Sequence, residues 1–254
     1  DENIFKSIIS KKNGIIIVGA CSYIDLEEEF IDSLSFISNS LGWPVLADAL
    51  NPIRNHASCF NSLITNYDFF LNDNKNFSGI EPETILLFGG LPTSKRLRSW
   101  VKLIDANIFT LNKLGKNINS LHNSSIPINS NLKSLAKSLE NININISKTW
   151  IHKWEQIESF AEKKIKSMLN KTDINFEGRI ANIVSKSAPP NCSFFISNSM
   201  SVRYTESFWN KNNSNNEMYY NRGVNGIDGN ISTAIGLAHN SKPVIMLCGD
   251  LAFI

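Results

Sequence analysis

Short runs of apolar residues alternate along the chain with longer segments in which apolar residues recur every three or four positions. The short runs predict buried β-strands and the longer segments predict amphipathic helices, and their alternation is typical of parallel βα units. In the first part of the chain the predicted strands are residues 14–19, 42–48, 84–90 and 106–111, and the predicted helices are residues 26–41, 60–71, 92–100 and 131–140. We therefore expect an α/β fold with a Rossmann-like layer of parallel strands flanked by helices.

The pattern starts again after residues 141–147, a polar segment that we interpret as a link between two domains. The predicted helices beyond it are residues 150–170, 178–187, 199–209 and 226–238, and the predicted strands are residues 193–198, 218–223 and 243–248. We predict a first domain over residues 1–147 and a second α/β domain over residues 148–254. The chain starts with Asp1 and stops just after a strongly apolar run, so we expect a piece of a longer protein whose second domain is truncated.

Net charge and hydropathy argue against two classes of partner. The 254 residues include 25 basic and 23 acidic ones, a formal net charge of +2. Nucleic-acid-binding arms and polybasic membrane anchors need clustered positive charge instead. No apolar run approaches the length of about 18 residues that a membrane-spanning helix requires. We therefore expect no nucleic-acid partner and no membrane span.

The cysteines and asparagines of the chain indicate no particular function. The four cysteines are widely spaced and form no C-x-x-C pair. This spacing favours reduced thiols in a cytoplasmic protein over a zinc site or a disulfide framework. Asn occurs 34 times and is concentrated in stretches such as residues 211–216. We interpret that enrichment as compositional bias.

Polar residues gather at the predicted carboxyl ends of three strands in the second domain, which is where open α/β sheets bind ligands. The clusters are Ser197–Ser199, Asn221–Gly223 and Gly249–Asp250. Each has a simpler explanation, because Ser199 and Asp250 could cap helices and Arg222 could form a surface ion pair. Three such clusters on one half-sheet favour a shared anionic ligand.

The residues around two of these strand ends indicate which ligands fit. Ser199 is expected at a helix N-terminus, where unpaired backbone N–H groups and the helix dipole attract anions. Arg203 lies four residues further on, hence on the same helix face, and a guanidinium group suits a carboxylate. The Gly249–Asp250 pair supplies the hard oxygen ligand that Mg²⁺ prefers, often beside phosphate groups.

Motifs in both predicted domains together resemble one family. In the second domain they are Asn198-Ser-Met-Ser-Val-Arg203, Asn221-Arg-Gly-Val-Asn-Gly-Ile-Asp-Gly229 with residues 231–234, and Gly249-Asp-Leu251; in the first they are residues 42–48 and 88–95. The family they resemble is the thiamine-diphosphate-dependent 2-succinyl-5-enolpyruvyl-6-hydroxy-3-cyclohexene-1-carboxylate synthase of menaquinone and phylloquinone biosynthesis. The resemblance covers essentially the whole chain. It implies a central domain at residues 1–147 and the amino-terminal part of a diphosphate-binding domain at residues 148–254.

The resemblance also implies roles for individual residues. The family decarboxylates 2-oxoglutarate and adds the resulting four-carbon carbanion to isochorismate, with the reactive chemistry supplied by thiamine diphosphate. By motif position, Asp250 is the expected ligand of Mg²⁺ (or Mn²⁺), and Ile227 is the apolar residue that supports the bent cofactor. The expected cofactor-binding residues are Asn198, Ile227, Gly249, Asp250 and Leu251, and the expected substrate-binding residues are Lys95, Ser199, Arg203 and Arg222.

The family's remaining functional groups are expected outside residues 1–254. These are the glutamate that activates the aminopyrimidine ring and a second metal ligand, so we expect no activity from this chain alone. A homodimer or a dimer of dimers is expected, because one site in the family is shared between two chains. Ser201, Val224 and Asn225 depart from the family's pattern, which affects the expected fit of the pocket.

Two other functions stay open on the sequence. One is an acetolactate-synthase-like carboligase of the same cofactor class, although the chain has no G-x-G-x-x-G fingerprint for a dinucleotide. Use of pyruvate as readily as 2-oxoglutarate would favour it. The other is a non-catalytic Rossmann-like module that binds a nucleotide or a small anion. Coding sequence upstream without a pyrimidine-binding domain would favour that module.

Overall fold

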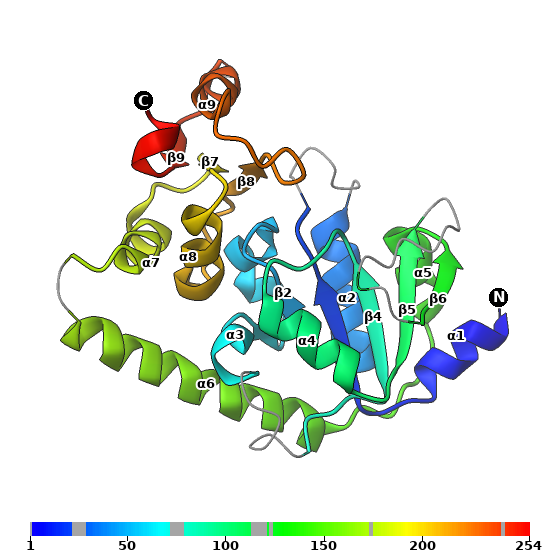
Figure 1. Ribbon diagram of the computed structural model, residues 1–254. Helices are drawn as coiled ribbons and strands as arrows, with labels where there is room; N and C mark the ends of the chain where they lie inside the picture. The colour runs from blue at the N-terminus through cyan, green and yellow to red at the C-terminus, as the bar shows by residue number, and fades with distance from the viewer. Residues whose placement is uncertain are drawn as a thin grey trace.

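A six-stranded parallel sheet organises the first half of the chain in the computed structural model (Figure 1). The structure describes residues 2–21, 29–71, 79–112, 121, 124–172, 175–239 and 242–254. The strands are β1 (Gly14–Val18), β2 (Val45–Ala47), β3 (Leu63–Ile64), β4 (Thr84–Phe88), β5 (Asn107–Asn112) and β6 (Ile126–Asn129). Their order is β3-β2-β1-β4-β5-β6, so the connections reverse direction between β1 and β4, as in Rossmann-like sheets. The predicted α/β fold is confirmed.

The central strands are buried on both faces, which explains why they are continuous apolar runs. Ile16 of β1 pairs with Val45 on one side and with Leu86 on the other. Where these strands end, their loops pack directly on each other. A Cβ on Gly19 would lie 1.9 Å from the carbonyl oxygen of Gly90, so only glycine allows this approach.

Helices cover both faces of this sheet. Ile16 and Val18 point to one face and pack with α1 (Glu2–Ile9), α2 (Phe30–Leu41) and α5 (Leu132–Leu139). Ile15 and Ile17 point to the other face and pack with α3 (Tyr67–Phe70), α4 (Lys95–Leu103) and the start of α6. The start of the predicted helix at residues 26–41 falls partly outside the described residues, and α2 is described from Phe30. The alternation of side chains along the strands thus yields two cores.

The helix predicted over residues 60–71 is wrong. Its sequence instead forms the short strand β3 followed by the single turn of α3. Two long-range contacts account for the difference. Leu63 and Ile64 pair with β2, and the backbone N–H groups of Thr65 and Asn66 donate to the buried carboxylate of Glu158, at 2.9 and 3.1 Å. Tertiary hydrogen bonds therefore replace the helical ones.

Helix α6 (Lys148–Lys171) connects the two halves of the chain, and Figure 1 shows it extending from the first sheet towards α7 and α8. The Ser147 side chain caps it by accepting the backbone N–H of Trp150. Near its start, Trp154 is fully buried against Trp100 and Phe70 of the first half. Near its end, other apolar residues pack against α7 and α8. One helix therefore contributes to the cores of both halves.

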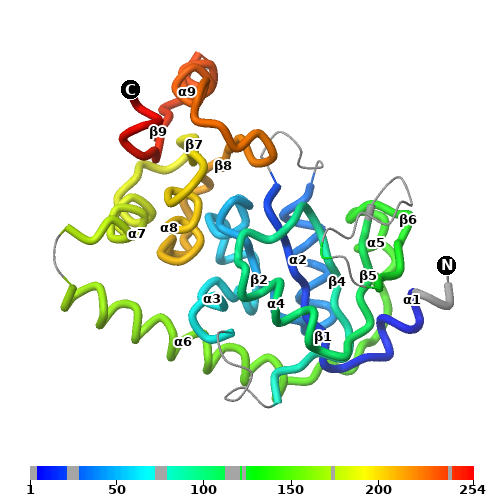
Figure 2. The backbone as a smooth tube through the Cα atoms, in the orientation of Figure 1, coloured from blue at the N-terminus to red at the C-terminus, as the bar shows by residue number. Residues whose placement is uncertain are grey.

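The second half contains a smaller parallel sheet in the order β8-β7-β9. Its strands are β7 (Ser193–Ile196), β8 (Glu217–Tyr220) and β9 (Val244–Leu247), and its helices are α7 (Gly178–Ser187), α8 (Met200–Phe208) and α9 (Asn230–Ala238). Helix α9 begins four residues later than the predicted segment 226–238, because Gly229 has φ +77° and cannot continue a helix backwards. Helix α1 and the end of the chain lie on opposite sides of the molecule (Figure 2).

The Asn-rich segment after α8 has a structural role that its composition did not indicate. It lies along the 3-10 helices Pro52–Asn55 and Ala57–Cys59 of the first half. Asn212 donates from its backbone N–H to the carbonyl oxygen of Arg54 at 2.8 Å and accepts from the N–H of Ala57 at 2.9 Å. The fully buried Asn55 side chain donates to the carbonyl oxygen of Asn216 at 2.9 Å. These asparagines hold the two halves together.

None of the described helices combines the length and the apolar character needed to cross a membrane. All four cysteines lie among the described residues and are thiols. Cys192 is buried, whereas Cys21, Cys59 and Cys248 are partly exposed.

Asn55→Ala should destabilise the protein by about 2–4 kcal/mol, because two buried groups would lose their partner. Those groups are the carbonyl oxygen of Asn216 and the indole N–H of Trp209, which donates to Asn55 Oδ1 at 3.0 Å. Urea unfolding followed by circular dichroism measures the loss. Asn61→Ala, at an exposed position, is the control and should change stability by less than about 0.5 kcal/mol. Equal effects of both substitutions would contradict the assigned role of Asn55.

Candidate functional site

A cavity of about 570 Å³ lies at the carboxyl ends of β7 and β9. It is lined by residues 197–201 after β7, residues 247–252 at and after β9, Ile227 before α9, and side chains of α7 and α8. Parallel strands present their carboxyl ends at one edge of a sheet, which explains why these segments meet although they are about 50 residues apart. This is the edge where the sequence predicts a ligand.

Many of the predicted site residues line this cavity. They are the five expected cofactor-binding residues Asn198, Ile227, Gly249, Asp250 and Leu251, together with the expected substrate-binding residue Ser199. Within the described residues, Lys95, Arg203 and Arg222 do not belong to the lining. Three separate segments of sequence thus contribute predicted residues to this cavity: residues 198–199, Ile227 and residues 249–251.

Asn198 organises the cavity's neighbouring loop. Its side chain is almost fully buried, and its Nδ2 lies 3.0 Å from the carbonyl oxygen of Val224 and 3.3 Å from that of Asn221. These bonds hold the loop that carries Arg222. The Oδ1 atom of Asn198 has no hydrogen-bond partner within the described part of the chain. The Nδ2 group of Asn198 therefore fixes the loop beside the cavity, and its buried Oδ1 can still accept a hydrogen bond.

Ser199 has a strained backbone. It precedes α8 with φ 69° and ψ −127°, a conformation that L-residues rarely adopt. Such strain costs about 1–3 kcal/mol and persists only where the surrounding structure imposes it. Its side chain makes no capping hydrogen bond to α8 in the described residues, and the residue is exposed at the cavity. The hydroxyl group is thus available to a ligand.

The Gly249–Asp250 segment is where the sequence predicts a metal-bridged diphosphate. A Cβ built on Gly249 would meet no described atom within 4 Å, and its φ of −80° suits any residue, so this chain does not itself require glycine there. Asp250 is exposed and uses Oδ1 to accept the N–H of Leu251 at 2.9 Å. No cluster of three His, Cys, Asp or Glu side chains occurs among the described residues. A metal ion here would therefore depend on Asp250 together with oxygens of a bound ligand.

Within the described residues, the three predicted cationic residues lack acidic partners. Lys95 is the exposed first residue of α4, whose start is capped by Ser94. The guanidinium group of Arg203 lies 3.9 Å from the sulfur of Met200, and that of Arg222 lies 3.5 Å from Asn225 Oδ1. In the described part of the structure, no carboxylate forms an ion pair with any of the three. Their charges are available to an anion.

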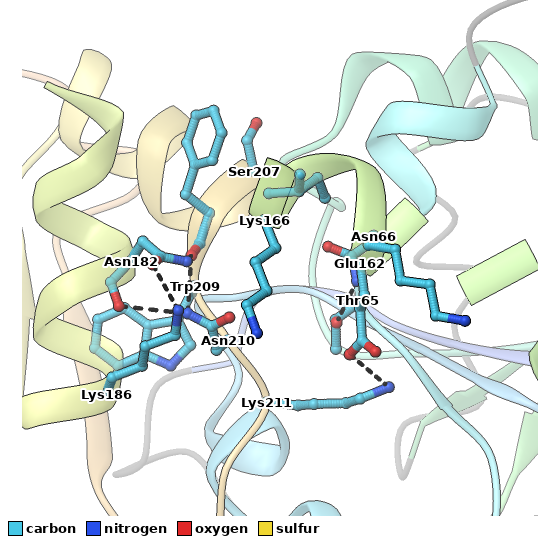
Figure 3. A pocket seen from close by; sticks show the side chains of 13 residues that line it. Thr65, Asn66, Glu162, Lys166, Asn182, Lys186, Ser207, Trp209, Asn210 and Lys211 are labelled. Atoms are coloured by element: carbon cyan, nitrogen blue, oxygen red, sulfur yellow. Dashed lines mark hydrogen bonds and ion pairs between the residues drawn. The ribbon is translucent and has the colours of Figure 1, made fainter. Parts of the chain in front are cut away.

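A second cavity, of about 320 Å³, lies between the halves and is shown in Figure 3. Most of its polar side chains bind one another. Lys211 lies 3.2 Å from Glu162, and Lys186 donates to Asn182 Oδ1 at 2.8 Å. Asn210 donates to the hydroxyl of Ser185 at 2.9 Å. None of the predicted site residues lines this cavity, and its contacts join α6, α7 and the Asn-rich segment.

A buried group of four ionisable residues joins the halves at another point, and sequence reasoning missed it. Arg54 Nη2 lies 3.1 Å from Glu206 Oε2, and Tyr67 Oη lies 2.5 Å from Glu206 Oε1. Asp48 is close enough to interact electrostatically with Arg54 and Glu206. We call these four residues the buried cluster. All are at most 2 % exposed. The one signal for the buried cluster in the sequence is Asp48, the acidic residue that ends the predicted strand 42–48.

Burial perturbs the acids of the buried cluster. Desolvation, followed by the negative charge of Asp48, raises the pKa of Glu206 to about 8. Desolvation also raises the pKa of Asp48, although N–H groups of Thr93 and Leu50 oppose this. Tyr67 Oη lies near two acceptors, Glu206 Oε1 and, at 3.1 Å, the carbonyl oxygen of Ala47, but has one proton. A proton on Glu206 would satisfy both contacts and leave the cluster electrically neutral.

Comparison with known proteins agrees with this architecture. A family model described as "Middle domain of thiamine pyrophosphate" matches residues 3–196, well over half of the chain. The chain belongs to this family.

Curated relatives extend the match along nearly the whole chain. Proteins named 2-succinyl-5-enolpyruvyl-6-hydroxy-3-cyclohexene-1-carboxylate synthase are 36% identical in Gloeothece citriformis and 35% identical in Rippkaea orientalis and Trichodesmium erythraeum. The matches cover 97–99% of this chain. The chain spans 42–44% of the length of these relatives. The resemblance to this synthase predicted from the motifs is confirmed.

Glu206→Gln should reduce the pH dependence of stability. The pKa of Glu206 is raised to about 8 from 4.5, so its contribution is fully present below pH 4.5 and is lost as the pH rises through 8. The free energy of unfolding of the variant, relative to the unmodified protein, should therefore increase between pH 5 and pH 8.5. Urea unfolding at a series of pH values measures this. Parallel pH profiles for the two proteins would show that Glu206 keeps an ordinary pKa.

Proposed function

We propose that the protein is a thiamine-diphosphate- and Mg²⁺-dependent carboligase that decarboxylates 2-oxoglutarate and adds the resulting four-carbon unit to isochorismate. The product would be 2-succinyl-5-enolpyruvyl-6-hydroxy-3-cyclohexene-1-carboxylate, for menaquinone or phylloquinone biosynthesis. One observation carries the proposal: all five residues expected at the cofactor, together with Ser199, line a single cavity. The shared name of the relatives supports the choice of substrates.

Residues around the cavity suit the cofactor. When bound, thiamine diphosphate would supply the electron sink needed to remove CO₂ from a 2-oxo acid. Asp250 would hold Mg²⁺ (or Mn²⁺) against the diphosphate, and Gly249 would let the phosphate oxygens approach the backbone. Ile227, an apolar residue at the cavity wall, would support the organic part of the cofactor.

The three predicted cations suit the proposed substrates, which are both dicarboxylates. Arg203 and Arg222 would bind carboxylate groups through paired N–H donors, which is the geometry that guanidinium groups offer. Lys95 would add a cation from the first half of the chain, and the strained Ser199 would donate its hydroxyl. The absence of acidic partners for the three cations in the described residues supports these roles, because no ion pair has to be broken before an anion binds.

Other parts of the proposal concern the whole protein. We place the boundary between the central domain and the diphosphate-binding domain at residues 147 and 148, where Ser147 caps α6. A homodimer or dimer of dimers in the cytoplasm, an activating glutamate outside this chain and inactivity of the chain by itself all stay predictions. Ser201 lies in the cavity wall, so its departure from the family's pattern bears directly on cofactor fit.

Arg203→Ala in the full-length enzyme should lower kcat/KM for 2-oxoglutarate by about 2–4 kcal/mol in transition-state free energy, as for a lost charged contact. Spectrophotometric assay of product formation measures the effect. Lys102→Ala, which removes a cation from the exposed end of α4, is the matched control and should change kcat/KM by less than twofold. If the unmodified enzyme uses pyruvate as well as 2-oxoglutarate, the acetolactate-like function replaces this proposal.

Asp250→Asn should weaken Mg²⁺-dependent binding of thiamine diphosphate by about tenfold or more, because a neutral amide is a poorer ligand for a hard cation. Isothermal titration calorimetry of the full-length protein, with and without Mg²⁺, measures the affinity. Asp228→Asn removes an equal charge from the exposed loop before α9, outside the cavity lining, and should leave the affinity within twofold. Unchanged affinity in the Asp250 variant would remove this residue from the metal site.

A further inference from the structure

The backbone turn at residues 47–50, which follows β2, is bonded on one side to the second half of the chain. The carbonyl oxygen of Ala47 accepts from Arg54 Nε at 2.8 Å, and the N–H of Ala49 donates to Glu206 Oε2 at 2.8 Å. Arg54 in turn donates to the backbone carbonyl oxygen of Glu206 at 2.9 Å. Both the side chain and the backbone of Glu206 are therefore attached to this turn.

The same turn is bonded on its other side to the segment that leads into α4. The Asp48 carboxylate accepts the N–H of Leu50 at 2.8 Å and the N–H of Thr93 at 2.6 Å. Thr93 lies two residues before Lys95, and the intervening Ser94 caps α4. The position of Lys95 thus depends on a hydrogen bond to a carboxylate that is fully buried.

Glu206 is well placed to set the orientation of α8. It lies three residues after Arg203, so the two side chains are one turn apart on the helix. Arg203 is exposed while Glu206 is buried, and Glu206 is attached at its side chain and its carbonyl oxygen. A rotation of α8 that moved Arg203 or the strained Ser199 would break these contacts.

We propose that Asp48 and Glu206 are positioning residues, which hold Lys95 at a fixed place relative to Arg203 for the binding of a dicarboxylic 2-oxo acid. Arg54 joins the two acids by binding the turn and α8 together. The assignment of substrate residues rests on the proposed function. The positioning itself rests on the contacts of the turn 47–50.

The structure offers a matched control for simple loss of stability. Glu158 is 3% exposed and Glu206 is 2% exposed. Glu158 likewise accepts backbone N–H groups of another element, those of Thr65 and Asn66, and lies 3.4 Å from a lysine ammonium group, that of Lys211. It does not contact the turn 47–50 in the described residues. Glu158→Gln and Glu206→Gln thus make the same chemical change at comparable depth.

Steady-state kinetics of the full-length enzyme test the proposal through Lys95. Asp48→Asn keeps the side-chain volume but replaces one of two acceptor oxygens, and we expect a rise in KM for 2-oxoglutarate of about tenfold. The affinity for thiamine diphosphate should stay within twofold. In a Lys95→Met background, the further effect of Asp48→Asn on KM should vanish, because it acts through Lys95. An equal rise in KM with and without Lys95 would overturn the proposal.

Hydrogen exchange measured by mass spectrometry tests the same coupling without turnover. Asp48→Asn and Glu206→Gln should each speed amide exchange in both residues 91–97 and residues 200–206, whereas Glu158→Gln should not. The coupling would be refuted if exchange became faster only in the segment that carries the substitution. It would also be refuted if Glu158→Gln made exchange faster in both residues 91–97 and residues 200–206. An unmodified enzyme with no activity on 2-oxoglutarate would refute the proposed function alone, because the exchange result still decides whether the two segments are coupled.

Discussion

Burial of Arg54 against Glu206 is the interaction on which the arrangement of the two halves depends. Removing the Arg54 guanidinium group and the acids around it from water costs several kcal/mol, and it raises the pKa of Glu206 to about 8. Contacts within the cluster offset this cost only when the remaining donors and acceptors are also satisfied. Here the carbonyl oxygens of Ala47 and Glu206 accept from Arg54 Nε and Nη1, and the N–H of Ala49 donates to the Glu206 carboxyl group. Arg54 Nη2 faces Glu206 Oε2 at 3.1 Å. Because these groups belong to both halves, a shift of one half against the other would expose or unpair a charge.

This constraint matters for the candidate site, because the residues that would bind substrate belong to different halves. The cavity itself is formed by the carboxyl edge of the small sheet, where the segments after β7 and β9 meet. Lys95 starts a helix of the large sheet, and its position is determined by Asp48 through Thr93. Packing between the halves therefore sets the positions of these residues relative to one another, although they are far apart in the sequence. The strained backbone of Ser199 is consistent with a site whose geometry is imposed by its surroundings.

Local sequence patterns predicted most of the elements and failed where distant residues supplied the hydrogen bonds. The predicted strand at 14–19 and helix at 131–140 follow from local apolar patterns, and in the structure Asn131 caps that helix. Residues 60–71 carry enough apolar residues for a helix, but β2 and Glu158 bind their backbone groups instead. Likewise, the asparagines after α8 look like bias in composition, and only their partners at the 3-10 helices give them a role.

The sequence by itself determined the α/β class, the strand ends that carry polar groups, and the motifs that identify the family, because each depends on residues close together in the chain. Tertiary structure decided which of those groups share a cavity and which residues orient them. Asn198 was expected at the cofactor, yet its amide group binds a loop more than 20 residues away. The buried cluster likewise forms only in the tertiary structure, because its members are far apart in the sequence. Glu206 is separated from Arg54 by about 150 residues, and only packing of the two halves removes both side chains from water and makes each the other's partner.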